Sequence, residues 1–280
     1  MVLVLTGCAA PAPAIILSDL RPLPETNRLA VPLRVAVAAV ISPKGTAQGY
    51  QPLLNYLGRK INRPIELVQR RTYAEVNDLI AQGQVDMAFV CTSAYVEGHD
   101  WFGMELLAAP QVNGESVYHS VLIVPADSSV HTMSDLRGKV FAFTDPMSLS
   151  GRVYPTALVQ ALGSTPEKFF ARTFFTYSHD DAIRAVADRV ADGAMVDSLV
   201  YDFALARDPA LGRLTRQVVK SPAFGIPPVV VGPQVRPQLR AELQEILLGL
   251  ADDPSAQARE ALQSIGADRF VTIGDEAYRS

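Results

Sequence analysis

Three short apolar runs, LRVAVAAV (residues 33–40), PIELVQ (64–69) and VDMAFV (85–90), alternate with YQPLLNYLGRKI (50–61) and YAEVNDLIAQG (73–83). The apolar runs have the length and composition of strands, whereas the two intervening segments repeat apolar residues at helical spacing. A strand–helix–strand–helix–strand order predicts a parallel sheet with right-handed crossovers. Residues 33–90 therefore indicate an α/β fold.

The same alternation restarts further along the chain and predicts a second lobe. Strands are expected at residues 120–126, 140–145, 169–177, 193–198 and 214–221, and helices at 155–163, 180–193 and 198–206. A last strand at 226–232 precedes helices at 237–251 and 255–266. We expect two α/β lobes, with residues 33–117 and 222–280 in lobe 1 and residues 118–221 in lobe 2.

Composition limits the classes of partner. The chain has 280 residues, 49% of them hydrophobic and 19% charged, which is enough to build a substantial core. A net charge of -4 without a Lys/Arg run argues against nucleic acid as the partner. No apolar run reaches the roughly 20 residues that span a bilayer.

The first residues, MVLVLTGC, resemble the lipobox of bacterial lipoprotein precursors, in which the cysteine receives the lipid. We interpret residues 1–8 as a signal remnant ending at a lipidated Cys8, and the Pro-rich residues 9–32 as a tether. The alternative is a chance cysteine in an apolar leader, since no Lys or Arg precedes the short apolar run. Cys91 is the only other cysteine, and its position at a strand end favours a buried structural thiol.

The segment DPMSLSGRVYPTALV, Asp145–Val159, predicts a turn that leads into a helix and places Ser148 and Ser150 at the helix mouth. The first N–H groups of a helix have no partner inside the helix, so a serine there acts as an N-cap or the turn binds an anion. Gly151 would let such an anion approach the backbone closely. The segment by itself leaves both interpretations open.

Polar residues follow several of the expected strands. They are Thr92 and Ser93, residues 148–151, His179, and Asp197. Ligands of open α/β sheets bind at the carboxyl ends of strands, so we expect a site at this edge.

Several of these positions together resemble the periplasmic phosphonate-binding family, the extracytoplasmic receptors of ABC importers for phosphate, phosphite and phosphonate. The matching segments are TYAEV, VDMAFVCTSAYV, YHSVLIVPADSSVHTMSDLRGKVFAFTDP, SLSG, SHDDAIRAVADRVADGAMVDS and KSPAFGIPP. The resemblance implies a type II periplasmic-binding-protein fold, in which two lobes joined by two crossing segments close over the ligand.

The resemblance also implies ligand-binding residues. A Ser-Thr-Ser run at a helix mouth falls on Ser148, Leu149 and Ser150, with Gly151 next to it; the histidine falls on His179, and two tyrosines fall on Tyr73 and Tyr118. We expect His179 to bind an anion better at low pH, where its imidazolium forms.

Two departures from the family pattern concern the substituent of the ligand. Leu149 replaces a threonine and loses one hydroxyl donor, and Leu199 and Pro227 stand where relatives that bind aminoalkyl phosphonates carry acids. Asp197 lies nearby and is either a partner for such an ammonium group or the cap of the following helix.

Together, the lipobox and the family resemblance predict a lipid-anchored periplasmic or cell-surface receptor that passes a tetrahedral oxyanion to an ABC permease. We expect it to be monomeric and to need no cofactor. A receptor of the same fold that reports to a membrane signalling partner is an alternative. Ser150, His179 and Asp197 also have the residue types of a hydrolase triad, but no G-x-S-x-G elbow is present. His119 and the EGHD at 97–100 lack a repeated metal-ligand spacing.

Overall fold

The first strand, β1 (Leu33–Val37), packs different side chains on its two faces. Leu33, Val35 and Val37 belong to one buried cluster, and Ala36 belongs to another. This division follows from the alternation of side chains along a strand. The sheet that contains β1 is therefore covered on both sides.

The computed structural model describes residues 31–279. The predicted lipobox at Cys8, the signal remnant and nearly all of the predicted tether lie outside the described residues. In chain order, the elements after β1 are α1 (Pro43–Lys60), β2 (Ile65–Gln69), α2 (Tyr73–Ala81), β3 (Met87–Phe89), α3 (Thr92–Phe102), β4 (Glu105–Gln111), β5 (Val117–Tyr118), β6 (Ser120–Pro125), η2 (Met133–Leu136), β7 (Val140–Phe143), η3 (Leu149–Val153), α4 (Tyr154–Ala161), α5 (Pro166–Phe169), β8 (Arg172–Phe175), α6 (His179–Ala187), β9 (Gly193–Asp197), α7 (Ser198–Arg207), α8 (Leu211–Leu214), β10 (Thr215–Lys220), β11 (Phe224–Gly225), β12 (Val229–Val231), α9 (Pro237–Leu248), η4 (Leu250–Asp252), α10 (Ala256–Ile265), β13 (Arg269–Val271) and η5 (Asp275–Tyr278).

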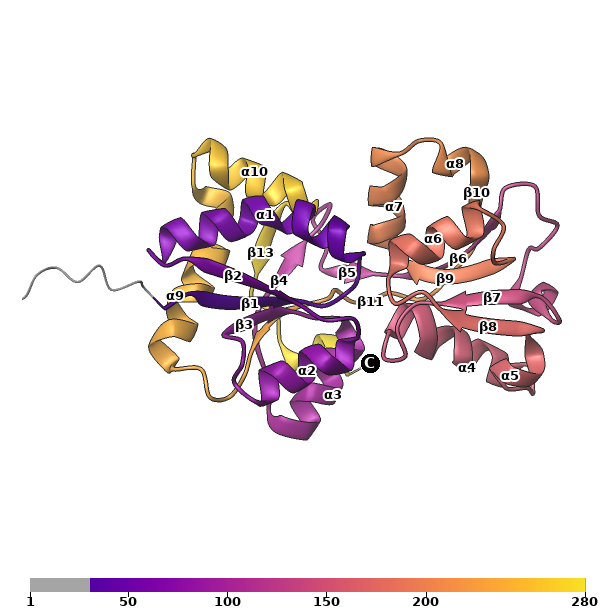
Figure 1. Cartoon of the computed structure of the whole chain (residues 1–280), viewed down its shortest axis with the longest axis horizontal. Coiled ribbons are helices and arrows are strands. Elements are labelled where there is room, and N and C mark those ends of the chain that lie inside the picture. Colours follow the sequence, from indigo (N-terminus) through magenta and orange to yellow (C-terminus); the bar gives the residue numbers. More distant parts are fainter. Residues whose placement is uncertain (1–30, 280) are drawn as a thin grey trace, which may run out of the picture. The chain divides into compact units, whose positions relative to one another are not determined.

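The first sheet has the strand order β13-β4-β12-β3-β1-β2 (Figure 1). Strand β1 pairs in parallel with β2 and β3, which confirms the prediction for residues 33–90. Strands β12 and β13 join this sheet antiparallel to their neighbours. The sheet is therefore mixed rather than parallel. We call this sheet and its helices lobe 1.

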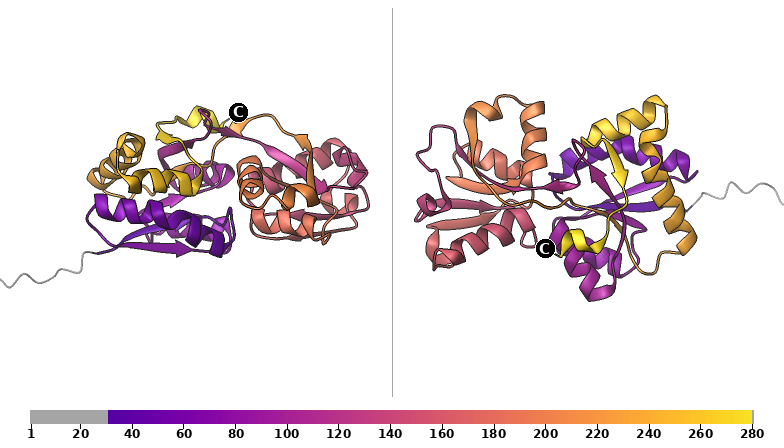
Figure 2. Two further views of the ribbon diagram at one scale, coloured as in Figure 1. Left: turned by 90° about the horizontal axis from the view of Figure 1, so that it is seen from above. Right: turned by 180° about the vertical axis from the view of Figure 1, so that it is seen from behind.

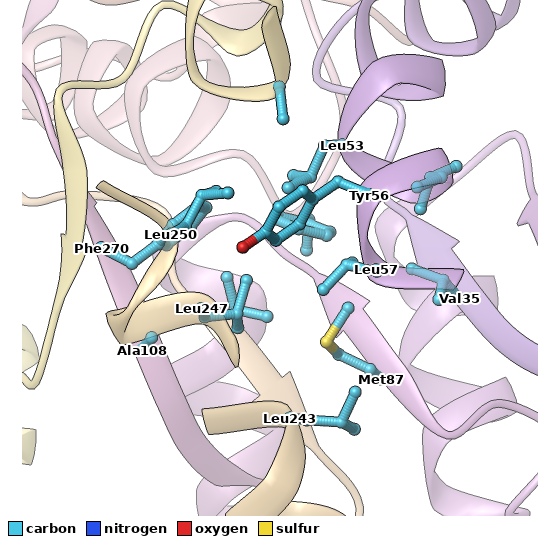
Figure 3. Close-up of a cluster of buried hydrophobic side chains, with 14 of the residues drawn as sticks. Val35, Leu53, Tyr56, Leu57, Met87, Ala108, Leu243, Leu247, Leu250 and Phe270 are labelled. Atoms are coloured by element: carbon cyan, nitrogen blue, oxygen red, sulfur yellow. The ribbon is translucent and has the colours of Figure 1, made fainter. Parts of the chain in front are cut away.

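The core of lobe 1 lies between the first sheet and helices α1, α9 and α10. Leu53 and Leu57 of α1 point into the same cluster as Leu247 of α9 (Figure 3). The opposite face of the sheet is covered by α2 and α3, through residues such as Val76 and Ala94. Burial on both faces explains why the strands read as nearly continuous apolar runs.

The second sheet has the strand order β10-β6-β9-β7-β8 and forms lobe 2 with its helices. Strand β7 is parallel to β8 and β9, whereas β6 is antiparallel to β9 and β10. Side chains of α6 and α7 pack on one face of this sheet, and side chains of α4 and α5 pack on the other. Views from above and from behind show the same two sheets (Figure 2).

Two chain segments connect the sheets and pair with each other. Strand β5 pairs antiparallel with β11, with Tyr118 opposite Phe224. The hydroxyl of Tyr278, near the C-terminus, donates to the carbonyl of Ile226, which follows β11. The chain thus crosses between the lobes twice, and η5 supports the second crossing.

Some predicted elements differ from the structure. Helix α1 begins at Pro43 rather than near residue 50, because proline is pre-organised for the first helical turn. Helix α3 and strand β4 were not predicted, and of the strand expected at residues 169–177 only β8 forms.

Among the described residues, no helix combines the length and apolar character that crossing a membrane requires.

Candidate functional site

Ser148 lies at the start of the helical segment that follows β7. Its Oγ accepts a hydrogen bond from the N–H of Gly151 at 3.0 Å, which confirms the N-cap interpretation. The same Oγ lies 3.5 Å from Nε2 of His179, and the side chain is completely buried. Because the cap uses an oxygen lone pair, the hydroxyl proton stays available as a donor. Capping and ligand binding are therefore compatible at Ser148.

Ser150 is held by its backbone and leaves its side chain uncommitted. Its carbonyl accepts a hydrogen bond from Oγ of Ser120 at 2.7 Å. Its own Oγ is buried and has no hydrogen-bond partner in the described part of the chain. A buried hydroxyl without a partner costs free energy, so this oxygen is suited to a ligand.

His179 is the first residue of α6 and has one ring nitrogen available for a ligand. Its Nδ1 lies 3.0 Å from the backbone N–H of Asp197, which can only donate, so Nδ1 is the acceptor. The proton of the neutral ring is therefore on Nε2, the nitrogen nearest Ser148. Burial lowers the pKa of His179 to about 3.

The expectation that His179 binds anions better as an imidazolium is therefore wrong. Desolvation disfavours the charged ring, and Nδ1 has no room for a second proton while it accepts from Asp197. Near neutral pH, His179 offers a single neutral N–H donor.

Tyr73 and Tyr118 bring two more buried hydroxyls to the same region. Tyr73 is the first residue of α2 in lobe 1 and Tyr118 lies in β5. Within residues 31–279, neither hydroxyl has a hydrogen-bond partner. Burial raises the pKa of both hydroxyls well above the usual value, and the charges of Cys91 and Asp197 contribute to both shifts. Both tyrosines therefore remain protonated donors, and Asp197 lies within electrostatic reach of each.

Gly151 is explained by packing. A Cβ at Gly151 would lie 1.8 Å from Oγ1 of Thr144, so the glycine is required for packing against that side chain. The sequence analysis expected this glycine to let an anion approach the backbone, whereas the contacts show that it lets the backbone approach Thr144. The Cys91 thiol contacts the Ser93 hydroxyl at 3.8 Å, and burial raises the pKa of this thiol, as expected for a structural cysteine.

Thr92 and Ser93, the other polar residues at a strand end, are already engaged. Oγ1 of Thr92 donates to the carbonyl of Gly225 at 2.7 Å, and Oγ of Ser93 donates to the carbonyl of Met147. Their hydroxyl protons are therefore used inside the protein.

Asp197 ends β9 and caps α7. Its Oδ1 accepts from the N–H groups of Leu199 at 2.8 Å and Val200 at 3.4 Å, as the capping alternative expects. Its Oδ2 has no hydrogen bond in the described chain. Burial raises the pKa of Asp197 to about 7. The carboxyl is thus close to its titration point near neutral pH, in the same region as the five buried neutral donors of Ser148, Ser150, His179, Tyr73 and Tyr118.

This geometry predicts how binding depends on pH. Below pH 7 the Asp197 carboxyl is mostly neutral, whereas above pH 7 its negative charge repels a bound anion. The affinity of the protein for an oxyanion should therefore fall by up to tenfold per pH unit between pH 7 and 9. Asp197→Asn keeps a good N-cap residue and should remove this fall.

Titration calorimetry of both proteins at several pH values checks this prediction. The Asn variant also serves as the control for the ligand's own titration, which is common to both proteins. Equal pH dependence in the two proteins would show that Asp197 acts only as a helix cap.

A hydrolase triad of Ser150, His179 and Asp197 is not assembled. The Asp197 side chain caps α7, while His179 accepts from its backbone N–H instead of donating to its carboxylate. With its proton on Nε2, the ring cannot accept a proton from a serine at that nitrogen.

Within residues 31–279, no three His, Cys, Asp or Glu side chains are grouped to hold a metal ion.

Contacts between the lobes were missed by the sequence analysis. Asp145, just before the serines, accepts from the N–H of Tyr73 at 3.0 Å and from the N–H of Met147 at 2.8 Å. Asp180, next to His179, accepts from the N–H of Ser42 at 2.8 Å and from its Oγ at 2.6 Å. The only sequence signal for these contacts was position: Asp145 precedes the two serines, and Asp180 directly follows His179.

These contacts close the two lobes around the site. The N–H of His179 donates to the carbonyl of Val40 at 2.8 Å. A backbone hydrogen bond therefore joins the two lobes beside the side-chain hydrogen bonds. Tyr73 comes from lobe 1, whereas Ser148, Ser150 and His179 come from lobe 2. The donors therefore form a single buried set only when the lobes meet.

Two sheets joined by two crossing segments, with polar groups buried where the lobes meet, define the two-lobed type II periplasmic-binding-protein fold. The model of the family described as "ABC transporter, phosphonate, periplasmic substrate-binding protein" matches residues 35–278. The chain belongs to this family.

Known relatives are similar over most of the described chain. The phosphate-import protein PhnD of Mycolicibacterium smegmatis is 29% identical over 195 residues, which are 64% of this chain and 61% of that protein. The binding component of an ABC phosphonate transporter from Pseudomonas aeruginosa has a TM-score of 0.82 at 21% identity, covering 88% of this chain and 82% of that chain. PhnD1 from Prochlorococcus marinus, solved with methylphosphonate, has a TM-score of 0.79 at 17% identity, covering 88% and 94%. The two structures show the shared fold.

Proposed function

We propose that this chain is an extracytoplasmic solute-binding protein that captures a small tetrahedral oxyanion between its lobes and delivers it to an ABC importer. The ligand class is phosphonate, phosphite or phosphate. Lipid attachment at Cys8 and a monomeric state belong to the same proposal.

The observation that carries the proposal is the set of buried, unsatisfied donors. The hydroxyls of Tyr73, Tyr118 and Ser150 are buried without a hydrogen-bond partner among the residues that the structure describes, and Nε2–H of His179 faces Ser148 beside them. An oxyanion would accept hydrogen bonds from several of these groups at once. Each hydrogen bond to a charged group contributes about 1.5–3 kcal/mol.

All the proposed donors are electrically neutral groups. No Lys or Arg side chain is among the proposed ligand residues, so the anion is held by hydrogen bonds and by the N-terminal end of a helix. Such a site replaces the hydration shell of the anion without a countercharge. Lobe closure removes competing water, as in other two-lobed receptors.

A thermal-shift and calorimetry screen of the purified protein tests the proposal. At 100 times the dissociation constant, a true ligand should raise the free energy of unfolding by about 2.7 kcal/mol. Methylphosphonate, phosphite and phosphate are the first compounds to compare, with acetate and an amino acid as controls. Failure of every tetrahedral oxyanion to bind at millimolar concentration would contradict the proposal.

Tyr73→Phe tests the site itself. The variant keeps the buried ring but removes the unpartnered hydroxyl, so affinity for the oxyanion should fall about tenfold or more while stability holds or rises. Calorimetry and denaturant unfolding measure both quantities.

Tyr201→Phe is the matched control for this variant. Tyr201 is also buried, but its hydroxyl hydrogen-bonds Thr215 in lobe 2 at 3.0 Å. This control should lose stability and keep its affinity. The same pattern in Tyr73→Phe would place Tyr73 in the core rather than in the site.

A further inference from the structure

We propose that the ligand is an organophosphonate with an uncharged, apolar substituent, held in a chamber that begins beside Asp197. This inference rests on the proposed function and narrows its ligand class. The chamber has a volume of about 450 Å³. Residues from β1, α1, α7 and the second crossing line it.

The wall of the chamber is mainly apolar. Its lining includes Val37, Tyr50, Phe89, Leu199, Phe203 and Ile226. A neighbouring cavity of about 390 Å³ shares Val37, Tyr50, Leu199 and Phe203 with it, so the two spaces adjoin along α7. Both lobes therefore contribute apolar side chains to one region of the cleft.

The chamber adjoins the proposed anion site through two residues. Asp197 lines the chamber, and its N–H donates to the ring of His179. Val90 also lines the chamber and directly precedes Cys91, which lies within electrostatic reach of Tyr73 and Tyr118. A group attached to a phosphorus atom held by these donors has this space next to it.

The charged side chains that line the chamber itself disfavour a second anionic group on the ligand. Among the described residues, the carboxylic acids of its lining are Asp197 and Asp202, and the lining contains no Lys, Arg or His. The cations Lys44, Arg184 and Arg207 line the adjoining cavity instead. Burial raises the pKa of both carboxyls of the chamber lining. A carboxylate on the substituent would lose its hydration beside these two acids, without a cation in the chamber lining to offset the loss.

An ammonium substituent is also poorly matched. Oδ1 of Asp197 is committed to the α7 cap, which leaves one carboxyl oxygen for a cation. An oxyanion bound beside Asp197 disfavours its ionised form further, because like charges at short range repel. A neutral carboxyl does not offset the desolvation of a buried ammonium.

Size favours a substituent larger than hydrogen. At about 30 Å³ for each water in the liquid, the chamber corresponds to roughly fifteen waters, far more than a P–H bond needs. Apolar groups that fill such a space gain affinity with each methylene. The expected gain is about three- to fourfold per added CH₂.

Calorimetry of a homologous series tests the inference. From methyl- through ethyl- to propylphosphonate, affinity should rise about three- to fourfold per step. The compounds 2-aminoethylphosphonate and phosphonoacetate should bind more weakly than ethylphosphonate. Leu199→Asn should bring the propyl-to-methyl affinity ratio towards one, whereas Leu162→Asn, at an exposed position of lobe 2, should leave the ratio unchanged.

The outcomes separate this inference from the function on which it rests. If no phosphonate, phosphite or phosphate binds, the proposed function itself fails. If methylphosphonate or phosphite binds but the series is flat, or if the amine or the acid binds best, the apolar chamber is wrong while the oxyanion site stands.

Discussion

Replacing Ser148 and Ser150 together by alanine is expected to lower the affinity for the oxyanion by about a hundredfold or more. The double variant removes two hydroxyl donors, each contributing about 1.5 kcal/mol or more to a charged acceptor. The backbone N–H groups of the helix mouth remain, so the loss should be large but incomplete. Calorimetry on the double variant measures it.

The two single variants should differ in stability. Oγ of Ser148 accepts the N–H of Gly151, so Ser148→Ala should also lower the free energy of unfolding by about 0.5–2 kcal/mol. Oγ of Ser150 has no hydrogen-bond partner in the described part of the chain, so Ser150→Ala should keep or raise stability. Unchanged affinity in the double variant would mean that the serines only cap the helix.

Asp180→Ala is expected to lower ligand affinity by about tenfold to a hundredfold, although Asp180 is not among the proposed ligand residues. The Asp180 carboxylate receives two hydrogen bonds from Ser42, and both cross between the lobes. Their loss destabilises the closed arrangement in which the donors meet, and the apparent affinity falls with the closed population. The dissociation rate should rise correspondingly in stopped-flow measurements.

Two further variants isolate the contact between the lobes. Ser42→Ala removes one crossing bond, and the Ser42 side chain makes no cap bond to α1, so the helix should be preserved. Asp181→Ala changes the neighbouring acid, whose partner Ser178 lies in the same lobe. If Asp181→Ala weakens binding as much as Asp180→Ala, the effect comes from the start of α6 and not from closure.

Much of the fold follows from local pattern. The alternation of apolar runs and amphipathic segments predicted β1, β2 and β3 with α2 between them, because burial on both faces of a parallel sheet leaves a continuous apolar signal. The apolar residues of strand β4 and helix α3 do not repeat at a spacing that distinguishes a strand from a helix. Strand β12 appeared as an apolar run, but its antiparallel place between β3 and β4 depends on how the chain returns from lobe 2.

The candidate site was predictable as a set of residue types and not as an arrangement. Serines at a helix mouth and a histidine after a strand are local features, and the resemblance to a family grouped them with the two tyrosines. The protonation state of His179 was not predictable, because it depends on the N–H of Asp197, which is distant in sequence.

The sequence by itself determined the α/β class, the residue types of the site and the family, since periodicity, turn chemistry and motif spacing are carried by neighbouring residues. Only the tertiary structure decided which hydroxyls lack partners, that Gly151 packs on Thr144, and that Asp145 and Asp180 join the lobes. The physical reason is that burial, pKa and hydrogen-bond satisfaction depend on groups brought together from distant parts of the chain, and local sequence carries little information about such contacts.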